Sequence, residues 1–322
     1  MTSRLTPFAA IRPCPPSPAT ARRQRGAAVL VAMLVVAMAA VAASGFMFRS
    51  QVEWRRLENL TRQDQARLVL RATGDWAASV LRDDAQHSSV DHRGEAWATQ
   101  LPPVEAEGFR VSGRIEDQDG RFNLNNLVAD GKIDGAQLAI FRRLLRVLHL
   151  PEDLAEFVGD WLDTDNIPVN EGGAESAYYA GLSAPYQAAN RPLVSANELL
   201  RVKGFDRNVF SVLLPFVTAL PSKTAINLNT APPEVLAALV NGLSLDDAYS
   251  IVAKRDRSYY RNIQDFQQAL PYGLTASEGV AVSSQYFLVR ANIHYERLAI
   301  GSQVLYQRGG QGAPKLVWRA EI

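Results

Sequence analysis

One stretch of the chain gathers carboxylates without any neighbouring base. Residues 147–190 contain no lysine or arginine. Eight acidic residues lie there: Glu152, Asp153, Glu156, Asp160, Asp163, Asp165, Glu171 and Glu175. Asp160 and Asp163 are three residues apart, so on a helix they share one face. A loop through Asn170 and Gly172-Gly173 then turns the chain back. Carboxylates packed this closely repel one another unless a cation lies among them.

The donor types in this stretch favour calcium over zinc. Calcium takes about six to eight oxygen ligands from flexible loops, whereas zinc prefers His and Cys, which are absent between Asp160 and Glu175. The stretch is not an EF-hand, because Ile167 occupies the next ligand position after Asp163-x-Asp165 and no glycine follows. A solvated acidic loop without a metal is the alternative.

Catalysis by paired carboxylates is a second chemical interpretation. Glycosidases use two such groups as acid and base, and they bind sugars on aromatic side chains. Four aromatic residues near the acidic stretch could serve: Trp161, Tyr178, Tyr179 and Tyr186. Such residues more often pack in cores. The four histidines are scattered, and no H-E-x-x-H, nucleophile elbow or phosphate loop occurs, so we predict no catalytic residue.

The elements that must hold the acidic stretch begin with a helix of membrane length. Three arginines and Gly26 precede twenty-two residues without a charge, Ala27 to Phe48. A helix of that length is about 33 Å long and can cross the roughly 30 Å hydrocarbon core of a bilayer. Because basic flanks stay in the cytoplasm, we expect a cytoplasmic N-terminus and a single span, with the C-terminal domain on the far side.

Three interpretations of this N-terminal stretch remain. A cleaved secretory signal has an apolar region of about 7–15 residues, so this run is too long, although Ala40-Val41-Ala42 could form an exit site. A plain signal anchor fits the length. The junction between Gly26 and Ala27 also resembles the processing site of type IV pilin-like precursors, in which a peptidase cuts after the glycine and methylates the new N-terminus. Val31 stands where those proteins usually have Glu.

Beyond the span, apolar residues continue at helical spacing to about Leu81, which predicts one unbroken helix of more than fifty residues. Its apolar stripe needs a partner such as a sheet; a solvated helix or a coiled coil is the alternative. Alternation predicts a strand at 109–115. After a turn at Asp119-Gly120, residues 121–127 alternate again, so the two segments would form a hairpin.

From about residue 132 the periodicity is helical. Asp134 with Gln137 and Ser195 with Glu198 form capping boxes, and Gly204 supplies a helix stop. Strand-like segments return at 284–295, 297–307 and 315–322. We therefore predict an α+β fold in which a long N-terminal helix packs on a small antiparallel sheet and a large all-helical domain is inserted between the strands.

This interpretation divides the chain into five segments. They are a cleaved and unstructured cytoplasmic leader (1–26), a transmembrane segment (27–48), a pilin-like helix with the first strands (49–131), the inserted helical domain (132–282) and the returning strands (283–322). The single cysteine, Cys14, lies in the leader, so the mature chain would have no thiol. Without the five leader arginines, 29 bases face 33 acids and the formal charge is −4, which disfavours nucleic-acid binding.

A segment of the helical domain resembles DNA-binding helix-hairpin-helix modules. It runs from Ile226-Asn227-Leu228-Asn229-Thr230-Ala231-Pro232 through Asn241-Gly242-Leu243-Ser244 to Arg255. Such hairpins use Gly-x-Gly so that backbone N–H groups can approach a phosphate. Here Ser244 replaces the second glycine, and two acids follow it. We interpret the segment as a helix-hairpin-helix or SAM-like scaffold without the activity; a membrane-anchored DNA-binding or uptake protein is the alternative.

Nearly all of the chain after the leader resembles the minor pseudopilin K family of type II secretion systems, also called general secretion pathway protein K. The motifs that carry the resemblance are Gly26-Ala27 with Val31, Gly120-Arg121-Phe122-Asn123-Leu124-Asn125-Asn126-Leu127, Asp160-Trp161-Leu162-Asp163-Thr164-Asp165 with Gly173-Ala174-Glu175 and Tyr178-Tyr179, Glu198-Leu199 with Val202-Lys203-Gly204, and Ile226 to Pro232. The Pro-rich leader is longer than these precursors usually have, which leaves a later start open.

The resemblance implies a non-enzymatic subunit at the tip of a short periplasmic pseudopilus that exports folded proteins across the outer membrane. Implied partners are minor pseudopilins I and J, other pseudopilins, the prepilin peptidase and secreted substrate. The peptidase would cut between Gly26 and Ala27, with N-methylation of Ala27, and the protein would stay in the inner membrane. Lacking Glu at Val31 and carrying a bulky insertion, the subunit would begin or cap the filament.

The resemblance also implies structural calcium in the helical domain. On the matching motif, Asp163, Asp165 and Glu175 are the expected ligands. Three further candidates complete the set: Asp160, Asn170 and Glu171.

Overall fold

The computed structural model describes residues 19–100, 102–106, 108–276, 278–295, 298–310 and 312–322. The chain divides into two compact units, residues 1–65 and 66–322. The second unit contains the sheet and the helical region, and it carries the candidate site.

Helix α1 (Ala19–His87) is one helix of 69 residues, which confirms the predicted unbroken helix. It starts inside the expected leader, so the prediction of an unstructured leader is wrong for residues 19–26. Alanine and arginine have high helix propensity and extend the helix backwards. Residues 1–18 lie outside the described part. Among the described residues, α1 is the one helix long and apolar enough to cross a membrane, and its most apolar window has a mean hydropathy of 2.6.

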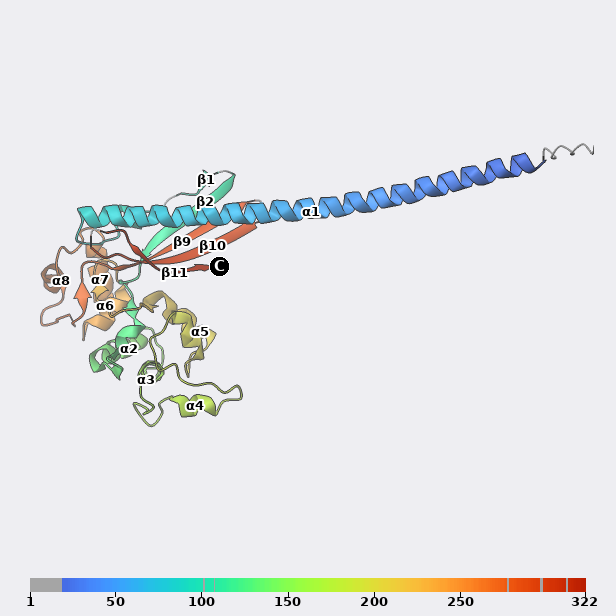
Figure 1. Cartoon of the computed structure of the whole chain (residues 1–322). Helices are drawn as coiled ribbons and strands as arrows, with labels where there is room; N and C mark the ends of the chain where they lie inside the picture. Colours follow the sequence, from blue (N-terminus) through green and yellow to red (C-terminus); the bar gives the residue numbers. More distant parts are fainter. Residues whose placement is uncertain (1–18, 101, 107, 277, 296–297, 311) are drawn as a thin grey trace, which may run out of the picture. The chain divides into compact units, whose positions relative to one another are not determined.

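Five antiparallel strands form the sheet, in the order β1-β2-β9-β10-β11 (Figure 1). Their bounds are β1 (Val104–Ala106), β2 (Phe109–Asp117), β9 (Tyr286–Tyr295), β10 (Leu298–Gln307) and β11 (Lys315–Glu321). The strand predicted from 109 and the three returning strands are therefore confirmed. Between α1 and β2 the chain forms the short helix η1 (Ala96–Ala98) and the edge strand β1.

The C-terminal part of α1 packs on one face of the sheet. Ala66, Leu70, Ala77 and Leu81 are buried at successive spacings of four, seven and four residues, as one helix face requires. They lie in two clusters with side chains of β2, β9 and β10, among them Ile293. Two of the four are alanines, which allow the helix backbone to approach the strands closely. The sheet is thus the partner that the apolar stripe needed.

Between β2 and β9 the chain forms a helical region with its own core. Its helices are α2 (Gly135–Val147), α3 (Leu154–Leu162), α4 (Ser176–Ala180), α5 (Arg207–Leu213), α6 (Pro233–Leu239), α7 (Leu245–Arg255) and α8 (Ile263–Ala269), with η2 (Leu124–Leu127), η3 (Ala196–Arg201) and η4 (Leu214–Phe216). Short strand pieces join them: β3 (Phe122–Asn123), β4 (Val128–Ala129), β5 (Lys132–Ile133), β6 (Val217–Thr218), β7 (Ile226–Asn227) and β8 (Val280–Ala281). Figure 1 shows α4 at the end of this region away from the sheet.

The predicted hairpin between 109–115 and 121–127 is wrong. Only Phe122 and Asn123 form a strand, and they pair in parallel with β6 instead of with β2. Residues 124–127 form the 3₁₀ helix η2, because the Asn123 side chain accepts a hydrogen bond from the N–H of Asn125 and caps that turn. Asn126 donates to the carbonyl of Thr224 at 2.8 Å. The asparagine side chains thus form hydrogen bonds with backbone groups about one hundred residues away. Their alternation with apolar residues had wrongly predicted the polar face of a strand.

Both ends of the helical region meet at one place beside the sheet. The N–H of Gln118 donates to the carbonyl of Tyr286 at 2.9 Å, so the two connections leave adjacent strands side by side. The Asp117 carboxylate accepts hydrogen bonds from the Ser284 hydroxyl at 2.6 Å and the Asn227 amide at 3.2 Å. Departing chain, helical region and returning chain therefore share one hydrogen-bond network.

Candidate metal site

Helix α3 carries the first predicted acidic ligand into the interior. Its apolar residues Leu154, Val158 and Trp161 are buried in the core of the helical region. Their spacing of three and four residues fixes the rotation of the helix. Asp160 is fully buried beside them, and Asp163 is the C-cap residue with an extended backbone. The helix therefore ends just where the chain must turn out toward the acidic loop.

Three carboxylates converge at this helix end. Asp160, Asp163 and Glu175 each offer an oxygen that lies within 4.8 Å of the other two. The three residues are 0%, 4% and 3% exposed. Within the described part of the chain, no hydrogen-bond partner is found for Asp163 Oδ1 or for either oxygen of Glu175. Buried carboxylate oxygens without donors are rare because desolvation is costly, so these atoms lack a positive partner.

Asp160 organises the loop that closes the site. Its Oδ1 accepts a hydrogen bond from the N–H of Val169 at 3.0 Å, and its Oδ2 accepts one from Ala174 at 2.8 Å. Gly173 lies so close that a Cβ there would collide with Asp160 Oδ2 and with Pro168. The glycine is therefore needed for close approach, and it brings Glu175 back to the end of α3.

Burial and mutual repulsion disfavour the state in which all three carboxylates are ionised. Burial raises the pKa of Asp163 to about 7, with further contributions from the charges of Asp165 and Asp160. Burial likewise raises the pKa of Glu175 to about 7, assisted by Asp163 and Asp160. The pKa of Asp160 is also raised by burial, although its two backbone hydrogen bonds act in the other direction. A bound cation would remove this penalty by stabilising the ionised forms.

The remaining predicted ligands lie at the rim. Asp165, Asn170 and Glu171 are exposed, and neither Asp165 nor Glu171 belongs to the converging group. Asp165 Oδ1 accepts a hydrogen bond from the N–H of Ile167 at 2.8 Å, and Asn170 Oδ1 accepts one from Gly172 at 2.9 Å. These side chains shape the loop. Their role as ligands stays a prediction.

Asn190 is a neighbour of the loop that was not among the predicted site residues. Asn190 has a left-handed backbone with φ of 45° and donates from its amide to the carbonyl of Asp165 at 3.0 Å. Its own Oδ1 is buried, without a hydrogen-bond partner among the described residues. Because Asn190 follows Asp165 by twenty-five residues and belongs to no motif, spacing could not have indicated it.

The aromatic residues considered as sugar platforms pack around one another. Trp161 meets the Tyr179 ring edge-on at a centroid distance of 5.0 Å, and Tyr179 stacks on Tyr186 at 5.2 Å. Tyr179 is fully buried. Lys203 Nζ lies 4.6 Å from the ring centroids of Phe157 and Tyr178 and donates to the carbonyl of Gly172 at 2.8 Å. The aromatic cluster therefore supports the loop from the core side.

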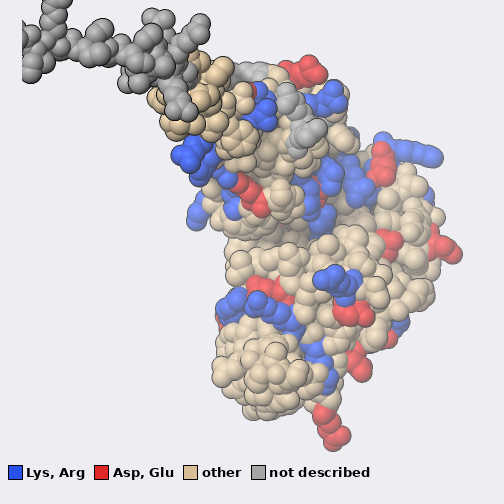
Figure 2. Space-filling model, turned by 90° about the vertical axis from the view of Figure 1, so that its right-hand side faces the viewer, with Lys and Arg blue, Asp and Glu red and all other residues tan. Residues whose placement is uncertain are grey.

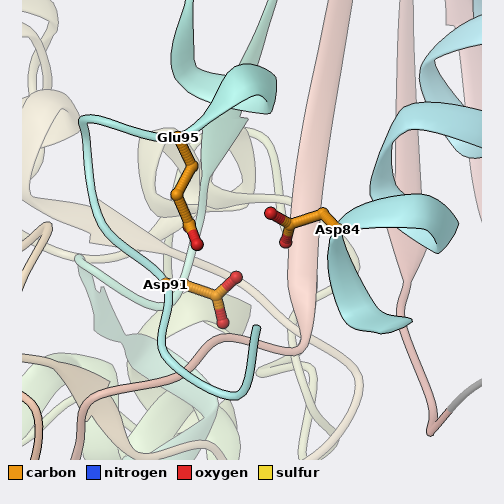
Figure 3. A group of neighbouring side chains, drawn as sticks. All are labelled: Asp84, Asp91 and Glu95. Carbon is orange, nitrogen blue, oxygen red and sulfur yellow. The ribbon is translucent and has the colours of Figure 1, made fainter. Parts of the chain in front are cut away.

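A second acidic group lies at the end of α1 and was missed by sequence reasoning. Figure 3 shows Asp84 on the helix and Asp91 and Glu95 on the following loop, with their carboxylates turned toward one another. Arg308 pairs with this group from the end of β10: Nη1 lies 2.6 Å from Asp84 Oδ2, and Nη2 lies 2.6 Å from Asp91 Oδ1. A guanidinium therefore supplies the cation here.

The helix-hairpin-helix segment folds as α6 and α7 but uses its polar groups internally. Ser244 caps α7 by accepting a hydrogen bond from the N–H of Asp247. Arg255 is 2% exposed and donates to the carbonyls of Leu228 and Ala231 at 3.0 and 2.6 Å. On the face drawn in Figure 2, basic and acidic side chains are mixed and no large basic surface forms. The hairpin thus uses these polar groups to hold its own loop together.

The predicted processing site lies in α1. Gly26 and Ala27 both have helical backbone, and Ala27 is exposed. Cleavage between them and methylation of Ala27 stay predictions.

The chain is similar to proteins of one family along most of its length. Two family models match, both described as "Type II secretion system (T2SS), protein K", over residues 120–222 and 226–285. The chain is similar to the type II secretion system protein K of Pseudomonas aeruginosa, with 35% identity over 92% of this chain and 93% of the relative. It is also similar to the protein of the same name from Aeromonas hydrophila, with 33% identity over 84% of this chain and 88% of the relative.

A solved structure has the same fold. It comes from a complex of GspK, GspI and GspJ of the type 2 secretion system of enterotoxigenic Escherichia coli. Its matching chain superposes with a TM-score of 0.73 and 24% identity, over 83% of this chain and 99% of that one. With the two identities above 30% along almost the whole length, these matches show that the chain belongs to the type II secretion system protein K family.

Proposed function

We propose that this chain is the minor pseudopilin at the tip of the periplasmic pseudopilus, where it helps start assembly of the filament that exports folded proteins. One observation carries this proposal: a helical region of well over one hundred residues is inserted between hydrogen-bonded neighbours β2 and β9 of the pilin-like sheet. Such a mass beside the sheet leaves little room for another subunit stacked above. Val31 adds to this, because it offers no carboxylate to the N-terminal amine of a neighbour.

The proposed placement has α1 spanning the inner membrane once, with a cytoplasmic N-terminus and a periplasmic C-terminal domain. The prepilin peptidase would cut between Gly26 and Ala27. Its partners at the tip would be minor pseudopilins I and J, since the related complex contains proteins with those names. Intact-mass spectrometry of the membrane-extracted protein tests the processing step: we expect the mass of a chain that begins at N-methylated Ala27.

Incorporation along the filament shaft is the test of the tip position. Because Gln118 and Tyr286 already face each other on adjacent strands, an Asn-Gly turn can join them in place of residues 119–285. We expect this shortened chain with Val31→Glu to appear along the shaft, whereas the unaltered chain appears only at one end. Labelling of purified pseudopili shows the position, with Val31→Gln as the matched control. Unaltered chain throughout the shaft would disprove the proposal.

The second part of the proposal is a structural calcium ion held by Asp160, Asp163 and Glu175. All donors are oxygens, three of these oxygens are buried without a donor, and the connecting loop is glycine-containing, as calcium sites often are. Magnesium is a poorer fit because it demands near-ideal octahedral geometry and keeps several waters. Bound calcium would fix the loop between α3 and α4.

Terbium luminescence is a direct test of the ion site, since Trp161 adjoins Asp160 and can sensitise a bound lanthanide. We expect saturable terbium emission that calcium displaces and magnesium displaces poorly. Asp163→Asn and Glu175→Gln should each abolish it, whereas Glu171→Gln at the exposed rim should leave it unchanged. Emission that survives both buried substitutions would mean that the ion binds elsewhere.

A further inference from the structure

A basic cluster lies on the sheet face opposite α1. Ile115 and Val289 pack in a cluster with Ala77 and Leu81 of α1, so their neighbours along β2 and β9 point to the other face. Those neighbours are Arg114 and Glu116 on β2, and Arg290 and the apolar Leu288 on β9.

Two arginines of this cluster stand directly opposite each other. Arg114 and Arg290 are paired in the β2–β9 register, where like charges destabilise a sheet. Glu116 offsets part of the repulsion: its Oε1 lies 2.6 Å from Arg114 Nε and 3.1 Å from Arg290 Nε. Arg121 also pairs with it, at 3.1 Å from Oε2. One carboxylate therefore serves three guanidinium groups, and these arginines lower its pKa against the effect of burial.

Among the described residues, Glu116 is the one acidic side chain that pairs with Arg114 and Arg290. Asp117 is the next acidic residue along β2, but its oxygens already accept hydrogen bonds from the Ser284 and Thr230 hydroxyls and the Asp119 N–H. In the described part of the chain, the Nη atoms of Arg114 and Arg290 take part in no recorded hydrogen bond or ion pair. The cluster thus retains positive charge and free donors at the cost of a like-charge pair. Functional sites commonly break local rules in this way.

A hollow of about 270 Å³ lies over these donors. Arg114 and Arg290 line it together with neutral hydrogen-bonding side chains and with Gly113 and the C-terminal residue. The neutral side chains are those of Gln100, Ser112, Asn292 and Ser302, and the C-terminal residue is Ile322. Ser112 is paired with Asn292 in the register, and Arg110 is paired with His294 beyond them. Polar donors therefore occupy three successive positions on this face, about 6.6 Å apart along each strand.

We propose that this basic hollow binds an extended acidic segment of a partner protein, whose carboxylates pair with Arg114 and Arg290. Arginine recognises carboxylates through paired N–H donors of its planar guanidinium. The repeat along the strands matches the spacing of alternate side chains in an extended peptide. A single free phosphate would contact only one of the three paired positions.

Peptide binding to the full-length chain in detergent is the test. The probe is Glu-Ser-Glu-Ser-Glu, compared with Gln-Ser-Gln-Ser-Gln and with inorganic phosphate. We expect the acidic peptide to bind at least tenfold more tightly than either. Combined Arg114→Gln and Arg290→Gln should weaken it at least tenfold, while Arg207→Gln, an exposed arginine of α5, should change it by less than twofold.

The melting temperature of the variants distinguishes a role of Arg114 and Arg290 in peptide binding from a role in stabilising the fold. Because the double substitution removes a like-charge pair, we expect its melting temperature to equal or exceed that of the unaltered chain. Arg114→Lys keeps the charge but not the planar donors, and it should lose part of the affinity. Absence of saturable peptide binding would overturn the proposal. So would phosphate that binds as tightly as the peptide and displaces it fully.

Discussion

Two groups of three carboxylates lie in the same unit of this molecule, and they differ in where a cation comes from. Asp84, Asp91 and Glu95 have Arg308, which reaches them from β10. Asp160, Asp163 and Glu175 lie in a stretch without lysine or arginine, and Lys203, which reaches the loop from outside this stretch, donates to the carbonyl of Gly172. A cluster of acids is therefore no evidence for a metal until its internal partners are known.

The two groups also differ in what they connect. Arg308 joins the end of α1 to β10 and donates to the Ser284 carbonyl at 3.0 Å, so it ties elements more than two hundred residues apart. Burial and Glu95 raise the pKa of Asp84 to about 6, although Arg308 opposes this. The other group joins only α3 to the start of α4. Losing its cation should therefore disturb a loop more than the whole domain.

Removing the Arg308 guanidinium should have the largest effect on the free energy of unfolding. Arg308→Met leaves buried carboxylates without a partner, which typically costs about 3–5 kcal/mol of unfolding free energy. Urea denaturation followed by circular dichroism measures it. The control is Arg207→Met on the surface, expected within about 0.5 kcal/mol of the unaltered chain. A loss below about 1 kcal/mol for Arg308→Met would show that the group is not held by its guanidinium.

Removing the external cation should cost less. At calcium one hundred times above its dissociation constant, binding adds about 2.7 kcal/mol to stability, and chelation with EGTA should remove that amount. Thermal unfolding with and without EGTA checks this. Glu175→Gln should unfold at the same temperature in both conditions. An equal EGTA shift in that variant would place the stabilising ion at another site.

Without calcium, the stability of the chain should depend on pH through Asp163 and Glu175. Asp163 and Glu175 have folded pKa values of about 7, above their ordinary values of 3.8 and 4.5. The folded state therefore binds protons more tightly than the unfolded state, so their stabilising contribution is present below about pH 4 and is lost as the pH rises to about 7. The free energy of unfolding measured in EGTA should decline between about pH 4 and pH 7. Asp163→Asn should make this decline smaller, and added calcium should abolish it.

Substitution of the exposed loop residue Glu171 should have the smallest effect on stability and on calcium affinity. Glu171 is exposed and stands outside the converging group, so Glu171→Gln should change unfolding free energy by less than about 0.5 kcal/mol with or without calcium. Calorimetric calcium titration gives a second measurement, in which we expect the affinity to change by less than threefold. A tenfold loss would make Glu171 a ligand and enlarge the site beyond three carboxylates.

Sequence reasoning succeeded where the signal is local. Helical periodicity predicted an unbroken helix to about Leu81, and α1 ends at His87. The strand-like segments near the C-terminus correspond to β9, β10 and β11. Asp160 and Asp163 could be placed on one helix face by their spacing, and the glycines before Glu175 indicated a chain that turns back.

Other features depend on contacts between distant parts of the chain, and these left no trace in spacing. Arg308 meets Asp91 across 217 residues, so its role could not be read from either neighbourhood. The run 121–127 alternates like a strand, but Asn123 and Asn126 bond to groups near residue 222 and the backbone turns instead. Tertiary hydrogen bonds overrode a pattern that was locally correct.

The meeting of both ends of the helical region at Gln118 and Tyr286 has a consequence for the order of folding. Strands β2 and β9 are separated by nearly 170 residues, and closing so long a loop from a disordered chain is slow. The helical region has its own core, and if this core forms first, it would bring the two strands together in advance. The inserted region would then act as the nucleus, and the sheet that α1 requires would form only after it. A substitution in the core of the insert would thus appear first as slow maturation of the pilin-like half.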